Sequence, residues 1–371
     1  MENVNNIFRA FGPEYIERFG DDLPGEHRKA MDAILKCRTE EAGIALYECE
    51  DCGHSHTMYR SCGNRHCPTC QHHKTREWLE SQINRQLPGH HFMLTFTVPE
   101  SLRRFIRSHQ RLAYAALFKA SAGAIKKLAA DDKHIGGDLP GFFGVLHTWG
   151  RTLEYHPHIH YIAPGGALSS KDRAWHPSRA DFYLPVRALS KIFRAKFRDE
   201  MKAAGLEGEI PVEVWETEWN VNCQAVGASA ASLKYLAPYV FKVAIANPAN
   251  GGTLSRWRIE PSPFATKNPK APGGEPWPWM PWSSSGVSCS PAAAGLPTGF
   301  MKVRYFGFIN PNCKVGLDTI SALIELSYGF NLPELDAGGL EPWQPIVCPH
   351  CGGALKLRAI VLSNGTVIRP G

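Results

Sequence analysis

The stretch that decides the fold is His-Pro-His-Ile-His-Tyr-Ile-Ala, residues 156–163. Polar and apolar residues alternate at its start, a pattern typical of a strand with one buried face. Side chains at i and i+2 of a strand point to the same side, so His158 and His160 converge while Ile159 packs into the core. Two imidazoles held in this way can bind a divalent metal ion in an open site. Alone the pair is a weak signal, because structural or incidental histidine pairs are more common.

A third metal ligand is predicted from the preceding strand, at residues 142–149, which forms a hairpin with the first. If the hairpin turns near residues 152–153, His147 falls opposite His158. Gln224 is another candidate, and His156 shares the strand face. We favour His147 because of this register.

Two tyrosines are spaced by one helical turn in Tyr235-Leu-Ala-Pro-Tyr239, within a predicted helix over 232–246. Residues four apart share one helix face. A tyrosine hydroxyl can attack a phosphate as a covalent nucleophile. Lys242, three residues after Tyr239, can neutralise the charge that develops. The alternative is that both rings are half-buried packing residues.

A long basic helix is predicted over 101–130. Arg103, Arg107 and Arg111 are spaced four residues apart, which places them in one stripe. From 101 to 127 the chain carries seven basic residues and no acidic one. The stripe suits contact with DNA phosphates, and a solvated helix face is the alternative. The hydrophobic pattern also predicts helices at 1–36, 75–87, 186–204 and 315–328, and strands at 91–98 and 212–222. Ordered structure is expected to resume at 300–308.

Cysteine spacing predicts a zinc site near the N-terminus. Cys49-x2-Cys52 and Cys67-x2-Cys70 are separated by 14 residues, close to the spacing of a two-knuckle zinc site. Two such turns supply four thiolates that complete a tetrahedron around one ion. Four thiolates leave no position for water, so this zinc is predicted to be structural rather than catalytic.

Other cysteines leave further metal sites open. A second zinc ion could be shared by three side chains of the same stretch: Cys37, Cys62 and His66. The alternative there is buried thiols and a surface imidazole. Near the C-terminus, Cys348-x2-Cys351 is half a site, which Cys313 or an unseen partner would complete.

Composition sets broad limits on the class of protein. The 371 residues, 43% of them apolar, suit two or three packed domains, and the net charge of +6 is compatible with a polyanionic partner. The N-terminus lacks a signal-peptide pattern, and no stretch approaches the roughly 18 apolar residues of a membrane span. We therefore expect a cytoplasmic protein with reduced thiols and no membrane partner.

These motifs, in this order, resemble those of insertion-sequence-91 family transposases, which are two-tyrosine HUH rolling-circle enzymes with an N-terminal zinc-binding domain. Three motifs carry the likeness: the paired histidines His158-Ile-His160, the first strand 96–99 (Phe-Thr-Val-Pro) and the helix motif Tyr239-x-x-Lys242. The zinc module also fits. The likeness covers residues 15–250 and 296–355.

The resemblance implies an α+β fold, with an antiparallel-sheet HUH nuclease core flanked by helices and preceded by a small zinc-binding module. It implies that magnesium or manganese on His158 and His160 polarises a scissile phosphate. Tyr235 or Tyr239 would then attack to form a 5′-phosphotyrosine. The implied partner is single-stranded DNA at the transposon ends and the target. Because the bond energy is kept, no nucleotide cofactor is expected.

Four regions are expected along the chain. They are an N-terminal helix and zinc-binding module at 1–88, a two-tyrosine nuclease domain at 89–250, an irregular segment at 251–299 and a C-terminal region at 300–371 with a Cys-Pro-x-Cys-Gly-Gly half ribbon.

Residues 256–295 depart from the family, since they are rich in proline and show no helical periodicity. With suitable codons, a one-base shift turns residues 275–290 into an amphipathic helical sequence similar to the family's. We favour a compensated frameshift, which would impair this copy, over a genuine proline-rich linker.

The competing function is a zinc-containing DNA-binding protein without catalysis, such as a regulator or a decayed transposase. The basic helix and the zinc module fit both functions. The paired histidines and tyrosines favour the enzyme, because a DNA-binding protein does not need them. A zinc hydrolase lacks support because the sequence has no His-Glu-x-x-His motif.

Overall fold

The computed structural model describes residues 4–150, 154–228, 230–241, 296–297, 299–329 and 346–370. The chain is an α+β protein that forms two compact units. One unit combines residues from both ends of the chain, and the other is built from central residues. Lys242 and the segment 256–295 lie outside the described residues.

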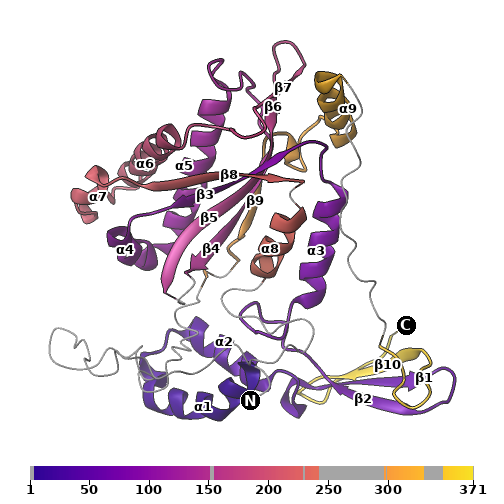
Figure 1. Ribbon diagram of the computed structural model, residues 1–371. Coiled ribbons are helices and arrows are strands. Elements are labelled where there is room, and N and C mark those ends of the chain that lie inside the picture. The colour runs from indigo at the N-terminus through magenta and orange to yellow at the C-terminus, as the bar shows by residue number, and fades with distance from the viewer. Residues whose placement is uncertain are drawn as a thin grey trace, which may run out of the picture. The chain divides into compact units, whose positions relative to one another are not determined.

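A five-stranded antiparallel sheet forms the centre of one unit, in the order β8-β3-β5-β4-β9 (Figure 1). Its strands are β3 (His91–Thr97), β4 (Phe142–Trp149), β5 (Tyr155–Pro164), β8 (Asn220–Gly227) and β9 (Val303–Phe306). β4 and β5 pair in the predicted register, with His147 opposite His158. Because β5 lies in the middle of the sheet, residues 159–164 are buried, which explains the apolar run after the histidines.

One face of this sheet packs against α5 (Gln110–Ala129) and α6 (Val186–Ala203) (Figure 1). Alternate side chains of the strands supply the apolar surface. Phe96 of β3 packs edge-on against Phe193 of α6, with ring centroids 5.1 Å apart. The buried hydroxyl of Tyr161 in β5 hydrogen-bonds Ser121 of α5 at 2.7 Å. Most of the largest fully buried side chains of the unit therefore lie on this face.

The opposite face of the sheet carries the histidines of β4 and β5. Trp78 of α3 (His72–Asn84) packs on Phe143 there, and its Nε1 donates to the Tyr305 hydroxyl at 2.9 Å. The helix α8 (Ala230–Phe241) also lies against β4 on this side. The histidines are thus held between a rigid sheet and a helix.

The basic helix predicted over 101–130 is interrupted at His109, so the predicted arginine stripe is not continuous. The first part, α4 (Arg103–Ser108), ends where His109 adopts φ −118° and ψ 38°, and α5 begins at the next residue. The first two arginines of the stripe belong to α4, whereas Arg111 belongs to α5. Four-residue spacing places side chains on one face only while the helix is unbroken.

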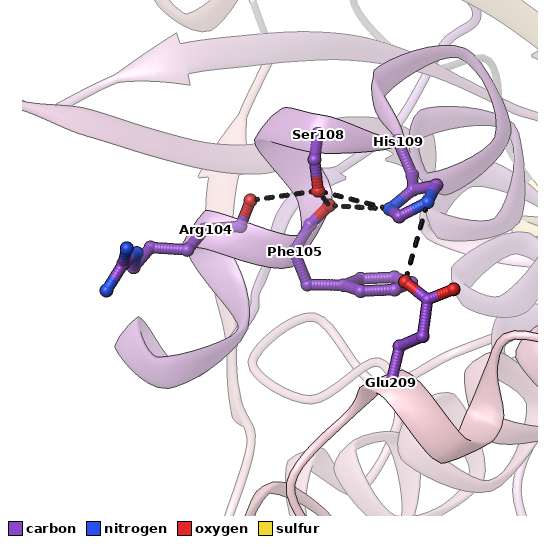
Figure 2. A network of polar contacts seen from close by, with 5 residues as sticks. All are labelled: Arg104, Phe105, Ser108, His109 and Glu209. Atoms are coloured by element: carbon purple, nitrogen blue, oxygen red, sulfur yellow. Dashed lines mark hydrogen bonds and ion pairs between the residues drawn. The ribbon is translucent and has the colours of Figure 1, made fainter.

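Side chains stabilise the break between α4 and α5 (Figure 2). The Ser108 hydroxyl donates to the Phe105 carbonyl at 2.9 Å and lies 3.1 Å from His109 Nδ1. On its other side, His109 Nε2 lies 3.6 Å from a carboxylate oxygen of Glu209. The His109 ring also stacks on Phe105. Backbone hydrogen bonds also span the junction, from the His109 amide to the Phe105 carbonyl at 3.1 Å and from the Ala113 amide to the His109 carbonyl at 2.9 Å.

Shorter elements complete this unit: η3 (Glu100–Leu102), β6 (Gly166–Leu168), β7 (Trp175–Pro177), η4 (Glu207–Glu209), α7 (Glu213–Glu216), η7 (Gly307–Ile309) and α9 (Leu317–Tyr328).

The strand predicted over 212–222 is wrong in its first half. Residues 213–216 are helical, and β8 begins only at Asn220. The reason is packing: Trp215 in the helix and Trp219 just after it both contact Phe197 of α6.

The other unit contains helices and a four-stranded antiparallel sheet in the order β11-β10-β1-β2. Its N-terminal elements are α1 (Val4–Phe19), η1 (Gly20–Asp22), α2 (Gly25–Lys36), η2 (Glu40–Ala42), β1 (Ile44–Cys49) and β2 (Ser55–Tyr59). Its C-terminal elements are β10 (Leu355–Val361) and β11 (Val367–Ile368). The expected C-terminal region at 300–371 is therefore divided, because β9 and α9 belong to one unit and β10 and β11 to the other.

Candidate functional site

Three histidines converge on the sheet face that α8 covers. The ligand nitrogens of His147, His158 and His160 all lie within 4.8 Å of one another. The hairpin produces this group, since His147 is opposite His158 and His160 follows two residues later on the same face. Three nitrogen donors that meet at one point can hold a metal ion.

Hydrogen bonds orient two of the three rings. His158 Nδ1 donates to the carbonyl of His156 at 2.6 Å, which leaves its Nε2 with a lone pair. His160 Nδ1 lies 2.9 Å from Thr95 Oγ1, directly across the strand pair. Within the described residues, His147 Nε2 is buried and has no hydrogen-bond partner. A metal ion would satisfy this buried nitrogen, and fixed outer partners are what metal-binding histidines normally have.

The histidines are electrically neutral near pH 7. Burial lowers the pKa of His158 to about 4 and that of His160 to about 3. Burial also lowers the pKa of His147 well below its usual range, with a further contribution from the charges of its neighbours. The cause is the cost of removing a charged imidazolium from water. Neutral imidazole is the form that binds metal ions.

The tyrosine pair of α8 borders the histidine group. The ring centroid of Tyr239 lies 4.4 Å from that of His147, and the Tyr235 centroid lies 6.0 Å from that of His160. The two tyrosine rings are 5.8 Å apart, as expected for residues four apart on a helix. Tyr235 is 50% exposed and Tyr239 is half-buried. Both phenols therefore lie beside the candidate metal ligands and outside the apolar core.

Four cysteines come together in the unit that combines both ends of the chain. The sulfurs of Cys37, Cys62, Cys67 and Cys70 lie within 4.8 Å of one another. The Cys70 sulfur is 3.5 Å from that of Cys37 and 3.6 Å from that of Cys62. Hydrogen bonds, first of all from the Cys37 thiol, lower the pKa of Cys67 far below its usual value. Four thiols at these separations suit a closed, structural zinc site.

The zinc ligands predicted from spacing do not share one site. Cys67 and Cys70 lie with Cys37 and Cys62, whereas Cys49 and Cys52 lie with the C-terminal pair Cys348 and Cys351. The reason is that β10 pairs with β1, which brings the C-terminal cysteines next to the first pair. Neither group includes His66 or Cys313. Cys37 and Cys62 are therefore partners as predicted, but the third and fourth ligands are thiols rather than an imidazole.

Two protein families match the chain. The "Transposase zinc-binding domain" family matches residues 7–98, and the family described as "Putative transposase" matches residues 141–249. The "Transposase for insertion sequence element IS801" of Pseudomonas savastanoi pv. phaseolicola is 33% identical over 147 residues, covering 38% of this chain and 34% of that protein. "Putative transposase y4qJ" of Sinorhizobium fredii is 31% identical over 330 residues, covering 82% of this chain and 80% of that protein. The chain belongs to the insertion-sequence-91 family of transposases. No solved structure matches it.

The two matched families coincide with the two groups of side chains in this transposase. The match to the zinc-binding domain includes all four cysteines of the first cluster. The second match includes the three histidines and both tyrosines. In the described part of the chain, no helix is long and apolar enough to cross a membrane. The family membership makes DNA the partner of the protein and DNA transposition its activity.

Two arginines of the predicted stripe lie beside the histidine strand of the transposase. A guanidinium nitrogen of Arg103 is 3.5 Å from His156 Nδ1. The guanidinium of Arg107 lies over the Tyr155 ring, 5.4 Å from its centroid. Arg111 lies in the first turn of the next helix, α5. Two guanidinium groups of α4 therefore lie against the start of β5, next to the histidine strand.

A buried lysine near the site was not predicted from the sequence. Lys302, which precedes β9, is only 4% exposed, and its ammonium donates to the carbonyl of Tyr239. Its charge contributes to the lowered pKa of His147. Nothing in the local sequence marks this lysine, because β9 joins the sheet from more than 130 residues beyond the hairpin.

The alternative third ligands, Gln224 and His156, are not part of the converging group. Gln224 of β8 is exposed and stands opposite Met93, on the far side of β3 from β5. The residue of β8 in line with His160 across Thr95 is Asn222. His156 hydrogen-bonds Arg103 and is not among the converging ligands. The geometry therefore favours His147.

Proposed function

We propose that this transposase cuts and rejoins single-stranded DNA by transesterification at a tyrosine, in the manner of a rolling-circle enzyme. The observation that supports the proposal best is the position of Tyr239, whose ring lies 4.4 Å from that of a histidine in the candidate metal site. A purely structural tyrosine pair has no need of three neutral, convergent imidazoles beside it.

His147, His158 and His160 would hold one divalent ion, Mg²⁺ or Mn²⁺, through nitrogen atoms. When bound, such an ion polarises a phosphate and stabilises the charge that develops on it. Nitrogen donors suit Mg²⁺ less well than oxygen donors do. We therefore expect Mn²⁺ to support cleavage at lower concentrations than Mg²⁺.

The tyrosines perform the covalent step. The hydroxyl oxygen of Tyr235 or Tyr239 loses its proton and bonds to the phosphorus, while the bond from phosphorus to the 3′-oxygen breaks. The leaving oxygen takes a proton and becomes a free 3′-hydroxyl. The protein then carries a 5′-phosphotyrosine, which a 3′-hydroxyl can attack in reverse. The second tyrosine serves a second cleavage or strand transfer.

Basic side chains around the site would hold the DNA backbone. Arg103 and Arg107 approach the histidine strand from α4, and Lys302 places a buried positive charge beside Tyr239. The sequence motif assigns a similar role to Lys242. Positive charges that are fixed before the reaction stabilise the phosphate as its charge grows.

The test uses 3′-labelled single-stranded oligonucleotides that tile the DNA flanking the coding gene. With Mn²⁺ present, the label should become attached to the protein through a tyrosine, and a shorter strand with a free 3′-hydroxyl should appear. Changing both Tyr235 and Tyr239 to Phe keeps the rings but should abolish the adduct. The matched control is Tyr59→Phe, which changes an exposed tyrosine outside the site.

The proposal fails if the double variant still forms the adduct. It also fails if the wild-type protein binds these oligonucleotides but never cuts them under any divalent ion. That second result would favour a DNA-binding protein without catalysis.

A further inference from the structure

We propose that Cys49, Cys52, Cys348 and Cys351 bind a second zinc ion, which makes the C-terminal strands β10 and β11 a structural part of the N-terminal zinc-binding domain. The ligands come from opposite ends of the chain, and the C-terminal pair lies outside the matched zinc-binding domain at 7–98. The inference concerns folding and does not depend on the tyrosine chemistry.

The two cysteine pairs are built on the same local turn. In each Cys-x2-Cys turn a glycine follows the second cysteine, and Gly53 and Gly352 have φ values of 69° and 79°. The amide of that glycine donates to the carbonyl of the first cysteine, at 3.0 Å from Gly53 and 2.8 Å from Gly352. Glycine suits this left-handed conformation because it has no Cβ. Both segments therefore have the form of a zinc knuckle, although they are distant in sequence.

The four sulfur atoms are spaced for a tetrahedron. All lie within 4.8 Å of one another, with Cys49 and Cys351 sulfurs 3.5 Å apart and Cys52 and Cys348 sulfurs 3.8 Å apart. Sulfurs bound to one zinc ion at about 2.3 Å in a tetrahedron are about 3.8 Å from each other. The thiols are free, so the spacing is that of ligands and not of disulfides.

The backbone around the cysteines brings the two turns close together. The amide of Glu50 donates to the carbonyl of Ala354 at 3.0 Å. A Cβ atom on Gly353 would come within 2.1 Å of the Asp51 carboxylate, so a larger residue here would require the Asp51 side chain to move. His56 Nε2 lies 3.2 Å from the Cys348 sulfur and can donate to it. A hydrogen bond of this kind supports a zinc-bound thiolate.

The small sheet needs such a crosslink because it buries little apolar surface. None of the five residues of β2 is buried, and in β10 only Ala359 is buried. A sheet without a hydrophobic face is not stable on its own. Joining segments whose cysteines are 302 residues apart also carries a large entropy cost. A metal ion bound by both turns would supply the missing stabilisation.

Metal analysis of the full chain, purified under reducing conditions, tests the proposal. We expect two zinc ions per chain. The variant with Cys348→Ser and Cys351→Ser should keep one, and so should the variant with Cys62→Ser and Cys70→Ser. The matched control Cys313→Ser, which removes a cysteine outside both clusters, should keep two. The single variant Cys351→His, with Cys348 intact, should keep both ions, because histidine can replace a thiolate ligand.

A second measurement holds even if the serine variants fail to fold. Cadmium-113 spectra of the substituted wild-type chain should show two tetrathiolate resonances. A single cadmium resonance would overturn the proposal. So would one zinc ion per wild-type chain that is lost when Cys62 and Cys70 are changed to Ser but kept when Cys348 and Cys351 are. So would thiol titration in denaturant without reductant that shows Cys49, Cys52, Cys348 and Cys351 to be disulfide-bonded.

Discussion

Thr95 and His160 face each other across β3 and β5, with the threonine hydroxyl 2.9 Å from Nδ1 of the imidazole. The contact fixes the ring so that its other nitrogen is available to a metal ion. Thr95 touches neither DNA nor metal in the proposed reaction. It therefore acts as a positioning residue, and it offers a way to test the metal site without removing a ligand.

We expect Thr95→Val to weaken metal binding about 10- to 100-fold, because it removes the outer partner of a ligand histidine. Cleavage should recover as the Mn²⁺ concentration is raised, whereas His160→Ala should not recover. The control is Thr97→Val, at the position opposite His158, whose own ring is held by the His156 carbonyl. Equal metal requirements for the two valine variants would contradict the assigned role.

Lys302→Met should destabilise the folded protein by about 1–3 kcal/mol, because the carbonyl of Tyr239 loses a charged donor in a buried place. Removing the charge should also raise the pKa of His147, which Lys302 helps to lower. Denaturant unfolding measures the first effect and histidine NMR titration the second. Lys314→Met, at an exposed lysine, should change neither. An unaltered His147 titration would rule out the electrostatic contact.

Acid should destabilise the protein in part through His91, whose burial lowers its pKa from 6.5 to about 4. Above pH 6.5 the imidazole is neutral in both folded and unfolded chains. Between pH 6.5 and 4 the unfolded chain binds the proton first, so the free energy of unfolding falls as pH falls, by up to about 1.4 kcal/mol per pH unit. His91→Gln should reduce this slope, and the exposed control His134→Gln should not. Parallel stability curves for the two variants would refute the prediction.

Arg103→Ala should weaken binding to single-stranded DNA of any sequence, because its position beside the histidine strand suits a phosphate contact. Loss of one such contact lowers the dependence of log affinity on log salt by about 0.7. Arg179→Ala removes an exposed arginine that is paired with Asp181, and should leave this slope unchanged. If Arg103→Ala weakens only some sequences, the side chain contacts bases instead.

Local patterns in the sequence were sufficient to predict the core of the candidate site. Alternation identified β5 as a strand, and a short hairpin determined that His147 would face His158. These relationships involve residues close in the chain, so a periodicity and one turn are enough to define them. The prediction of a tyrosine pair on one helix face succeeded for the same reason.

Features that depend on distant segments could not be predicted in this way. Four cysteines near the N-terminus were grouped by spacing, yet two of them pair with Cys348 and Cys351 because β10 joins β1. Lys302 reaches the site only through the addition of β9 to the sheet. At the helix break, His109 contacts Glu209, which lies 100 residues further along the chain. In each case tertiary contacts decide between arrangements that the local sequence allows equally.

The pairing of β1 with β10 has a consequence during synthesis. At about 5–20 residues per second, a ribosome needs roughly 15–60 s to extend the chain by the 302 positions from Cys49 to Cys351. For that time β1 has no partner on the side that β10 will occupy, and an unpaired strand edge is prone to aggregation. A transcript broken before codon 348 would yield a nascent chain that cannot close this sheet. Completion of the zinc-binding unit is therefore expected to be a late event in synthesis, because its last strands and its last two cysteines are translated after the central sheet.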